Sequence, residues 1–332
     1  MLASGQHERA LAQLSELFDG VPLEHLNVFE PGQSLTTLGS RIIESVGRVI
    51  RNDRPRAVIV QGDTITAFGA AMAAFYEHTP VIHVEAGLRT SSIAQPFPEE
   101  LHRRTISSIA TLHLAPTEDA ASNLRAEGVP AERIRVTGNT GQDALRLVLD
   151  GAPRTPSSDD DIHCVLTIHR RENALRAGDI AEGLKRATER HPIRITAVRH
   201  PNREVWAPLE ACLLKLGCVE FLDPLPYPNM VRLLSSSSFV LTDSGGLQEE
   251  AVALGVPVLV ARQETCRPEG ISAGGGVVVG TDPEVIAEWM SRIASDSVLR
   301  ARMSVKSDTY GDGYAAKRCV DAVIELGAEV FA

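Results

Sequence analysis

Short β-branched runs alternate with longer amphipathic stretches along this chain, and this alternation constrains the fold more than any other feature. Apolar runs followed by segments of helical spacing are typical of βα units, which build a mainly parallel sheet. The runs that we interpret as strands are residues 57–60, 80–84, 112–115, 164–168, 193–198, 219–222, 239–242 and 257–260. The pattern predicts an α/β fold with two Rossmann-like, doubly wound domains.

A segment rich in Pro, Gly, Ser and Asp, residues 150–161, separates the two series of strands and predicts an exposed linker. We therefore expect an N-terminal domain over residues 1–150 and a C-terminal domain that begins at residue 151. Two such domains would leave a cleft at the carboxyl ends of their strands, where open α/β sheets usually bind ligands.

Composition excludes several classes of function. The chain has 332 residues, 43% of them hydrophobic, which is enough for a large core, but it contains no apolar run of membrane-spanning length and no secretory pattern at its start. The formal net charge of -10 opposes binding to nucleic acid. The five cysteines lack the spacing of a zinc site, so we predict reduced thiols, no metal and a cytoplasmic protein without membrane contact.

The stretch LTDSGGLQEE, residues 241–250, joins a predicted strand to a predicted helix through the turn Ser244–Gly246. Free backbone N–H groups and the positive end of the helix dipole meet at such a turn, and Gly245 and Gly246 let an anion approach the main chain. Phosphate fits this site, and Glu250 could accept hydrogen bonds from ribose hydroxyls one turn later. An equally plausible alternative is a simple N-cap by Asp243 or Ser244 without a ligand.

Carboxylates follow two neighbouring strands in the first half of the chain. Asp63 comes after residues 57–60, Glu85 comes after residues 80–84, and Glu99 lies beyond them. Loops at strand ends often carry chemistry, so these acids could point into one cleft. The alternative is structural, because a single Asp in such a place is usually a helix cap.

Candidate partners for an anion follow strands of the second half. His169 comes directly after residues 164–168, and Arg267 follows residues 257–260. A diphosphate site needs hydrogen-bond donors, which His and Arg supply. The alternatives are a structural histidine and, for Arg267, a surface ion pair with Glu264 or Glu269.

These pieces, taken in order, resemble the non-hydrolysing UDP-N-acetylglucosamine 2-epimerase family over almost the whole chain. The motifs that carry the resemblance are Gly62–Thr64, His83–Thr90, Pro98–Glu100 with Arg103, Pro116–Glu118, Val136–Thr140, His169–Glu172, Thr242–Gly246 with Gln248–Glu250, and Arg267–Glu269.

The resemblance implies a glycosyltransferase-B-like pair of domains with a sugar nucleotide between them. It ends the C-terminal domain at residue 309, implies that residues 310–332 pack back across the domains, and implies a homodimer. The implied reaction interconverts UDP-GlcNAc and UDP-ManNAc without a cofactor, by elimination of UDP to 2-acetamidoglucal and its re-addition. The implied residues are catalytic Asp63, Glu85, Glu99 and His169, and substrate-binding Arg103, Ser244, Gly245, Gly246, Glu250 and Arg267.

The chain also departs from the family pattern. Family members begin with a strand and a Gly-Thr-Arg-Pro-Glu-type loop, so we expect that the first βα unit is missing from this sequence. Cys266 replaces an acidic residue before Arg267, and Gln6-His7 is followed by Arg9 rather than by the pattern linked to regulation by substrate. Three alternatives remain: a hydrolysing epimerase that releases UDP and ManNAc, a glycosyltransferase, and a UDP-sugar-binding homologue with impaired catalysis.

Overall fold

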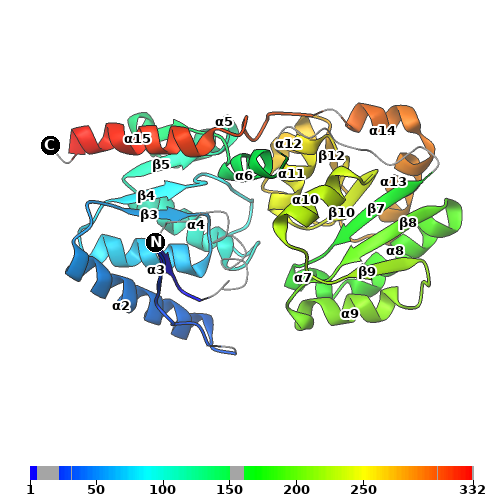
Figure 1. Cartoon of the computed structure of the whole chain (residues 1–332), viewed down its shortest axis with the longest axis horizontal. Helices are drawn as coiled ribbons and strands as arrows, with labels where there is room; N and C mark the ends of the chain where they lie inside the picture. The colour runs from blue at the N-terminus through cyan, green and yellow to red at the C-terminus, as the bar shows by residue number, and fades with distance from the viewer. Residues whose placement is uncertain (6–21, 31, 150–160, 305, 331–332) are drawn as a thin grey trace. The chain divides into compact units, whose positions relative to one another are not determined.

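The computed structural model describes residues 1–5, 22–30, 32–149, 161–304 and 306–330 (Figure 1). These residues form two compact units, one of residues 1–140 and 313–332 and one of residues 141–312. We call them unit 1 and unit 2. The predicted linker at 150–161, apart from Asp161, and the Gln6-His7 pair lie outside the described residues.

Unit 1 contains a four-stranded parallel sheet in the order β3-β4-β5-β6. Its strands are β3 (Val58–Gln61), β4 (Val81–Val84), β5 (Leu112–Ala115) and β6 (Ile134–Val136). A short parallel pair, β1 (Leu2–Ala3) and β2 (Glu24–His25), accompanies it. Strand β6 follows a short 3-10 helix, Ala131–Arg133, and neither β6 nor the short pair was predicted.

Helices cover both faces of this sheet. The helices of unit 1 are α2 (Leu35–Asp53), α3 (Ile65–Tyr76), α4 (Glu99–Ile109), α5 (Glu118–Ala126) and α15 (Ala315–Val330). Side chains alternate along a strand, so Val81 packs in the core beneath α2 and α3, whereas Ile82 packs with Cys319 and Ala322 of α15. The last helix of the chain therefore completes unit 1.

Helix α2 shows how the sequence dictates packing in unit 1. Ser34 caps it by accepting a hydrogen bond from the amide of Thr37, and buried Leu38, Ile42, Val46 and Ile50 recur every fourth residue. Helix α3 approaches closely at Gly69, where a Cβ atom would lie 2.7 Å from Cγ2 of Ile42. The apolar face of α2 and the close approach at Gly69 together hold α2 and α3 on the same face of the sheet.

Unit 2 contains a six-stranded parallel sheet in the order β12-β11-β10-β7-β8-β9. Its strands are β7 (Ile162–Thr167), β8 (Ile193–Val198), β9 (Val219–Leu222), β10 (Phe239–Thr242), β11 (Val258–Val260) and β12 (Gly276–Val278). All but β12 match predicted runs, so the predicted α/β class with parallel, doubly wound sheets is confirmed.

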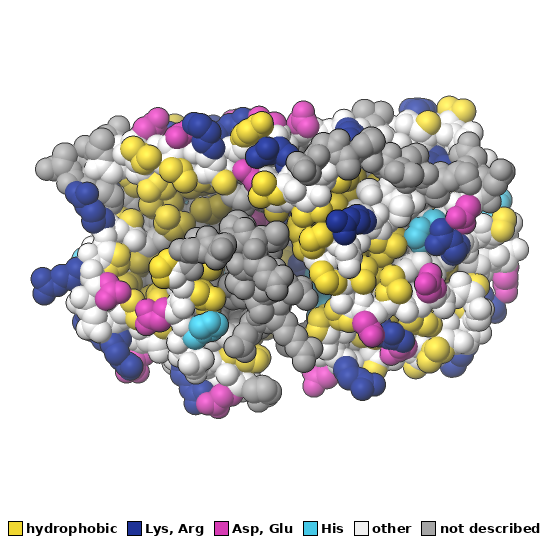
Figure 2. Space-filling view, in the orientation of Figure 1, with side chains coloured by type: hydrophobic (Ala, Val, Ile, Leu, Met, Phe, Trp, Pro, Cys, Tyr) yellow, Lys and Arg dark blue, Asp and Glu magenta, His cyan; other side chains and the backbone are white. Residues whose placement is uncertain are grey.

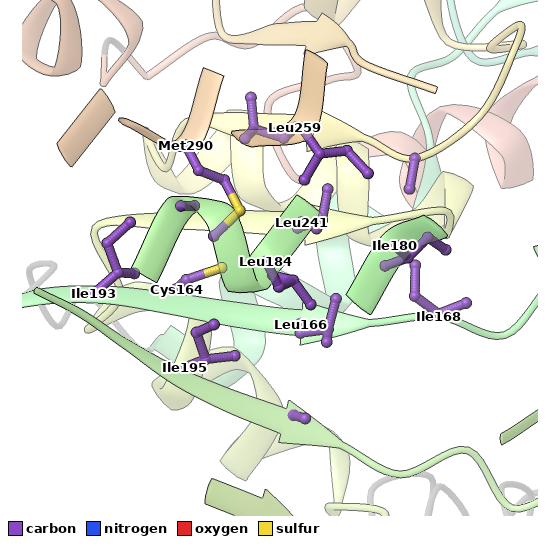
Figure 3. Close-up of a cluster of buried hydrophobic side chains, with 14 of the residues drawn as sticks. Cys164, Leu166, Ile168, Ile180, Leu184, Ile193, Ile195, Leu241, Leu259 and Met290 are labelled. Carbon is purple, nitrogen blue, oxygen red and sulfur yellow. The ribbon is translucent and has the colours of Figure 1, made fainter. Parts of the chain in front are cut away.

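The helices of unit 2 also form two layers. They are α6 (Thr140–Leu149), α7 (Arg171–Ala174), α8 (Ala177–Arg190), α9 (Arg203–Leu213), α10 (Tyr227–Ser235), α11 (Gly245–Leu254), α12 (Pro268–Ser272), α13 (Pro283–Ser295) and α14 (Ser297–Met303). Figure 3 shows Ile180 and Leu184 of α8 and Met290 of α13 packed on Leu166 and Leu241 of the sheet. Val165 and Val240 face the opposite layer.

The predicted boundary at residue 150 would leave α6 in the first domain. In the structure Leu145 of α6 packs in the core of unit 2, together with Val165 and Tyr310. The border between the units therefore falls at the start of this helix, between Thr140 and Gly141, and the chain returns to unit 1 at Gly313.

Candidate functional site

The predicted acids of unit 1 lie at the carboxyl ends of neighbouring strands. Asp63 follows β3 and Glu85 follows β4, and the two strands pair in parallel, so both acids lie at one edge of the sheet. Asp63 forms an ion pair with Arg103 of α4, with 2.6 Å between Oδ2 of Asp63 and a terminal guanidinium nitrogen of Arg103. The Asp63 side chain keeps 27% of its surface exposed, whereas Arg103 keeps 4%. A largely buried cation thus holds a carboxylate that solvent can still reach.

Glu85 adopts a backbone conformation that non-glycine residues rarely occupy. Its φ is +62°, and Gly62 beside it has a φ of +68°. A Cβ atom on Gly62 would lie 3.3 Å from Oε2 of Glu85, so glycine gives the carboxylate room next to the Asp63 turn. Strained backbone of this kind is concentrated at functional sites, which favours a chemical role for Glu85.

Glu99 begins helix α4, one helical turn before Arg103, so the two side chains share one side of the helix. Glu100 anchors that helix, because its buried carboxylate accepts from Nε of Arg104 at 2.7 Å and from the amide of Thr90 at 3.2 Å. His102 adds a contact of 2.9 Å between its Nδ1 and the carbonyl of Asp63. Helix α4 therefore fixes the backbone of Asp63 and presents Glu99 and Arg103.

Helix α3 is capped by Thr64, the residue after Asp63. Thr64, not Asp63, caps α3 by accepting a hydrogen bond from the amide of Ala67. The structural alternative for Asp63, a helix cap, is therefore wrong, and its carboxylate pairs with Arg103 instead.

A buried aspartate organises the strand ends of unit 2. Asp243 follows β10, is fully buried, and accepts hydrogen bonds from the amides of His169 and Arg170 at 3.0 and 2.9 Å and from Nδ2 of Asn173 at 2.8 Å. Its Oδ1 also lies 2.8 Å from Nδ1 of His169. Burial alone would raise the pKa of Asp243, but these hydrogen bonds and the histidine hold it below the ordinary value.

This contact settles how His169 is presented. Because Nδ1 donates to Asp243, Nε2 is the ring nitrogen that remains for a ligand. The side chain is 31% exposed, and its ring stacks on that of His200 with 5.9 Å between centroids. His169 is thus an oriented, accessible hydrogen-bonding group rather than a buried structural histidine.

The predicted turn Ser244–Gly246 opens helix α11, as expected from the sequence. Ser244 caps the helix by accepting from the amide of Leu247 at 3.4 Å, which bears out the N-cap alternative for Ser244, although a cap does not exclude a ligand. Gly246 is exposed and has no atom within 4 Å of where a Cβ would lie. The first turn of α11 therefore has the open backbone that an anion needs.

Arg267 lies against this helix start. A Cβ atom on Gly245 would be 3.0 Å from the guanidinium carbon of Arg267, so glycine is needed for the approach. Nε of Arg267 donates to Glu249 at 2.8 Å, and a second nitrogen contacts Sγ of Cys266 at 2.7 Å. The alternative of a surface ion pair with Glu264 or Glu269 is wrong, because Arg267 is 8% exposed and pairs with Glu249.

Glu250 lies one turn beyond Gly246 on α11. Burial raises the pKa of its carboxyl to about 7, and the hydroxyl of Tyr227 nearby partly opposes the shift. The pKa of Tyr227 is raised mainly by burial and, to a smaller extent, by the negative charge of Glu250. Glu250 would therefore change its ionisation close to neutral pH.

A cavity of about 260 Å³ opens beside these residues within unit 2. It lies where the strand order changes direction between β10 and β7, the switch point at which open α/β sheets bind ligands. Its lining includes His169, His200, Ser244, Leu225, Met230 and Leu247. The lining combines polar and apolar side chains, as small-molecule sites commonly do.

Three residues of this cavity region were not predicted as site residues: Asp243, Tyr227 and His200. Asp243 could have been predicted, because it lies directly at the end of a strand, in Thr242-Asp-Ser-Gly. Since Ser244 caps helix α11, the side chain of Asp243 is left for another role. Tyr227 and His200 gave no such signal, because they meet Glu250 and His169 only through the fold.

Within the described residues, no group of three or more His, Cys, Asp or Glu side chains is arranged to hold a metal ion. All five cysteines, each of them in a described segment, are free thiols. Among the described helices, none combines the length and the apolar character required to span a bilayer. Acidic and basic side chains intermingle over the described part of the face in Figure 2.

Comparison with known proteins adds the family. Residues 1–324 match the family described as UDP-N-acetylglucosamine 2-epimerase. The chain belongs to this family. The enzyme of that name from Escherichia coli K12 is 40% identical, with 96% of this chain and 89% of the relative covered. The predicted family is therefore confirmed.

Solved structures of UDP-N-acetylglucosamine 2-epimerases agree with the fold. The Neisseria meningitidis enzyme bound to UDP-GlcNAc is 35% identical, with a TM-score of 0.89 and with 97% of this chain and 90% of that chain covered. The Staphylococcus aureus protein MnaA in complex with UDP is 34% identical, with a TM-score of 0.91 and coverages of 100% and 89%. The predicted glycosyltransferase-B-like fold class is confirmed by these matches.

Proposed function

We propose that this chain is a UDP-GlcNAc 2-epimerase that interconverts UDP-GlcNAc and UDP-ManNAc. The observation that carries the proposal is the placement of Asp63 and Glu85 at adjacent parallel strand ends, with the Glu85 carboxylate against Gly62. Membership of the epimerase family gives this pair of acids its substrate class.

The proposed reaction removes the hydrogen at C2 of the sugar as a proton and breaks the C1–O bond, so that UDP leaves with the bonding electrons. The product is 2-acetamidoglucal, to which UDP adds back at C1 while C2 receives a proton on the opposite face. Hydrogen leaves and returns as a proton, so the net change requires no oxidant or reductant. Inversion requires acid/base groups on two faces, which the set Asp63, Glu85 and Glu99 supplies.

These carboxylates also suit the charge that develops during C1–O cleavage. The departing diphosphate leaves positive, oxocarbenium-like character on the sugar, and carboxylates near it stabilise that charge. Arg103 supports this role because its ion pair with Asp63 holds that carboxylate in place. We assign Arg103 to substrate binding and to positioning Asp63.

We assign UDP to residues of unit 2. The diphosphate would accept hydrogen bonds from Nε2–H of His169 in its imidazolium form, from the amides of Gly245 and Gly246 and from the Ser244 hydroxyl, with Arg267 behind the turn. Glu250 would accept from the ribose hydroxyls. His169, held by Asp243, is also suited to protonate or stabilise the leaving UDP.

We further propose the non-hydrolysing subtype and a homodimer, both supported by resemblance to the family. The hydrolysing alternative remains chemically open, because water could trap the same intermediate and release UDP with free ManNAc. Product analysis separates the two: the non-hydrolysing enzyme accumulates UDP-ManNAc, whereas the hydrolysing enzyme accumulates UDP and ManNAc. Sedimentation velocity tests the dimer.

The central experiment is incubation with UDP-GlcNAc in D2O. The proposal expects deuterium at C2 of both UDP-sugars as UDP-ManNAc accumulates, detected by NMR and mass spectrometry. Protein that binds UDP but gives neither exchange nor epimer would instead be a UDP-sugar-binding homologue. Turnover that depends on an added acceptor would identify a glycosyltransferase.

A further inference from the structure

Two buried histidines hold the turn that carries Asp63. His83 of β4 is fully buried, and its Nε2 lies 2.9 Å from the carbonyl oxygen of Gly62. His102 of α4 is 5% exposed, and its Nδ1 lies 2.9 Å from the carbonyl oxygen of Asp63. Two consecutive carbonyls of one turn are therefore each paired with an imidazole, and the two imidazoles come from different elements.

The carbonyl partners fix which nitrogen of each ring carries a hydrogen. A carbonyl oxygen can only accept, so Nε2 of His83 and Nδ1 of His102 are both donors. Burial, the largest effect, lowers the pKa of His83 to about 4, so near pH 7 its ring is neutral and its Nδ1 carries no hydrogen. The two rings thus present different nitrogens to the turn.

The turn needs this support because glycine gives it freedom. Gly62 has a φ of +68°, and its amide donates to the carbonyl of Val84 at 3.0 Å. Glycine has no side chain, so little resists rotation of the peptide unit between Gly62 and Asp63. Such a rotation would swing the Gly62 carbonyl away and change the direction in which the Asp63 side chain leaves the backbone. The contact with His83 opposes this rotation, and the contact with His102 holds the next carbonyl.

The two rings are themselves fixed in place. The ring of His102 stacks on that of Phe68 in α3, with 4.8 Å between centroids and 17° between planes. His83 lies within β4, which pairs with β3 on one side and β5 on the other. Neither donor can leave the turn without disturbing the packing around it. The carboxylate of Asp63 is held separately, by Arg103.

Each histidine is close in sequence to another of the proposed acids. His83 lies two residues before Glu85, and His102 lies three residues after Glu99, which begins α4. The hydrogen bonds to the Asp63 turn therefore connect the three carboxylates through short covalent paths. Misplacing a reacting group by about 1 Å can cost about 10²-fold in rate, so these connections matter for chemistry more than for binding of the nucleotide.

We propose that His83 and His102 are positioning residues for the epimerase reaction. By donating to the Gly62 and Asp63 carbonyls, they keep the Asp63 carboxylate in register with the acids that follow β4 and begin α4. The inference rests on the proposed function. Both histidines act through the backbone of the turn and not through contact with the substrate.

Amides of matching length provide variants that keep the donor. The side-chain nitrogen of glutamine is as many bonds from Cβ as Nε2 of histidine, and that of asparagine is as many as Nδ1. His83→Gln and His102→Asn therefore keep the hydrogen bond to the turn, whereas His83→Leu and His102→Leu remove it. Each leucine variant should lower kcat about 10- to 100-fold with UDP affinity changed less than about twofold, and each amide variant should stay within about threefold of the wild-type kcat.

His163→Leu is the control for the loss of a buried histidine. His163 is 3% exposed in β7 of unit 2, and its Nε2 lies 2.9 Å from Oγ1 of Thr196. It lies near the start of that strand, whereas His169 follows the strand's end. The control should lose stability in urea denaturation, as the other leucine variants do, but its kcat should stay within about twofold of the wild type.

The hydrogen positions can be tested without turnover. In the full chain with ¹⁵N-labelled histidine, NMR at pH 8 should show a hydrogen on Nε2 but not on Nδ1 of His83, and a hydrogen on Nδ1 of His102. The amide variants identify the two sets of signals, because each variant removes one ring.

Three results would overturn the proposal: a hydrogen on the wrong nitrogen of either ring, leucine variants that lose no more kcat than the control, or amide variants as slow as the leucine variants. Wild-type protein without deuterium exchange at C2 would refute the proposed function and the positioning role with it. Active wild-type protein together with any of the three results would refute the positioning role alone.

Discussion

Unit 1 and unit 2 both place an aspartate just beyond the end of a parallel strand, Asp63 after β3 and Asp243 after β10, but the two side chains have opposite surroundings. Asp63 remains partly exposed and is paired with a buried arginine, whereas Asp243 is fully buried and accepts four hydrogen bonds from the His169–Asn173 segment. We propose that unit 1 presents the carboxylate itself for chemistry. In unit 2 the carboxylate orients the His169 ring, and we propose that the remaining ring nitrogen, Nε2, faces the ligand.

The two arrangements suit the two different tasks that we propose for the units. A proton-transfer site needs carboxylates that a substrate can reach, and their placement comes from strained backbone at Glu85 and from the Arg103 contact. An anion site needs fixed N–H groups, so its carboxylate is hidden where it cannot repel the ligand. Four predictions test this contrast.

The largest effect is expected at Asp63. Asp63→Asn keeps the shape but removes the proton acceptor, so kcat should fall by about 10² to 10⁴ while UDP affinity stays nearly unchanged. Steady-state kinetics and calorimetry with UDP measure the two effects, and a melting curve checks the fold. Asp119→Asn, at an exposed acid of α5, is the control and should behave like the wild type. Equal losses of turnover and UDP affinity would contradict the division of labour.

Asp243→Asn should act on stability and on UDP together. The amide cannot accept all four hydrogen bonds, so we expect a loss of about 3 kcal/mol in the free energy of unfolding and weaker UDP binding. Urea denaturation measures the first effect. Asp223→Asn removes an exposed carboxylate that pairs with Arg199 and should change stability by less than about 0.5 kcal/mol.

The pH dependence of this effect has a definite sign. The pKa of Asp243 is lower in the folded than in the unfolded protein, so its contribution is present above the ordinary aspartate value of 3.8 and is lost as pH falls below it. Stability of the wild type should therefore fall towards the variant on acidification. A gap between wild type and Asp243→Asn that stays constant down to acid pH would contradict the assignment.

Gly87→Ala tests the backbone support of the Glu85 turn. Gly87 has a φ of +89°, and a Cβ there would lie 2.2 Å from the carbonyl oxygen of Ala120. Gly128 has a φ of +88° with nothing within 4 Å, so Gly128→Ala isolates the conformational cost of about 1 kcal/mol. Gly87→Ala should lose about 2 kcal/mol more and also reduce kcat. Equal destabilisation by the two variants would mean that the Ala120 contact relaxes freely.

The smallest effect concerns Glu250. Its pKa of about 7 means that the carboxylate forms as pH rises through neutrality, so UDP affinity should rise a few-fold between pH 6 and 8 if the carboxylate binds ribose. The pKa of Glu250 is higher in the folded than in the unfolded protein. The stability of the fold should therefore fall as pH rises from 4.5 to about 7, because the buried carboxyl resists ionisation. Glu250→Gln should flatten the affinity profile, as measured by calorimetry. A profile that persists in the variant would assign the titration to another group.

Sequence alone predicted the parallel sheets well because buried strands read as continuous apolar runs. Phe239–Thr242 and Ile193–Val198 were predicted with the bounds that the structure has. Strands β6 and β12 were missed, since Ile134–Val136 contains a charged residue and Gly276–Val278 begins at the last of three consecutive glycines. Such short edge strands are specified by their neighbours more than by their own composition.

The candidate site was predicted as a set of residues, but not as a set of contacts. Strand-end acids and the Ser-Gly-Gly turn are local patterns that sequence can reveal. The contact of Asp243 with His169 joins residues 74 positions apart, and that of Arg267 with Glu249 depends on how α12 returns to α11. Local spacing carries no information on such long-range choices of partner.

The chain's last described helix has a consequence for biosynthesis. Helix α15 covers Ile82, Leu112 and Leu114 of unit 1, and the hydroxyl of Tyr310 bridges the Arg267 carbonyl and the Gly270 amide in unit 2. Both elements leave the ribosome after everything they support. A nascent chain would therefore keep this sheet face uncovered and the loop at Arg267 without its Tyr310 contacts until residues 310–330 have emerged, and neither unit would reach its final packing before then.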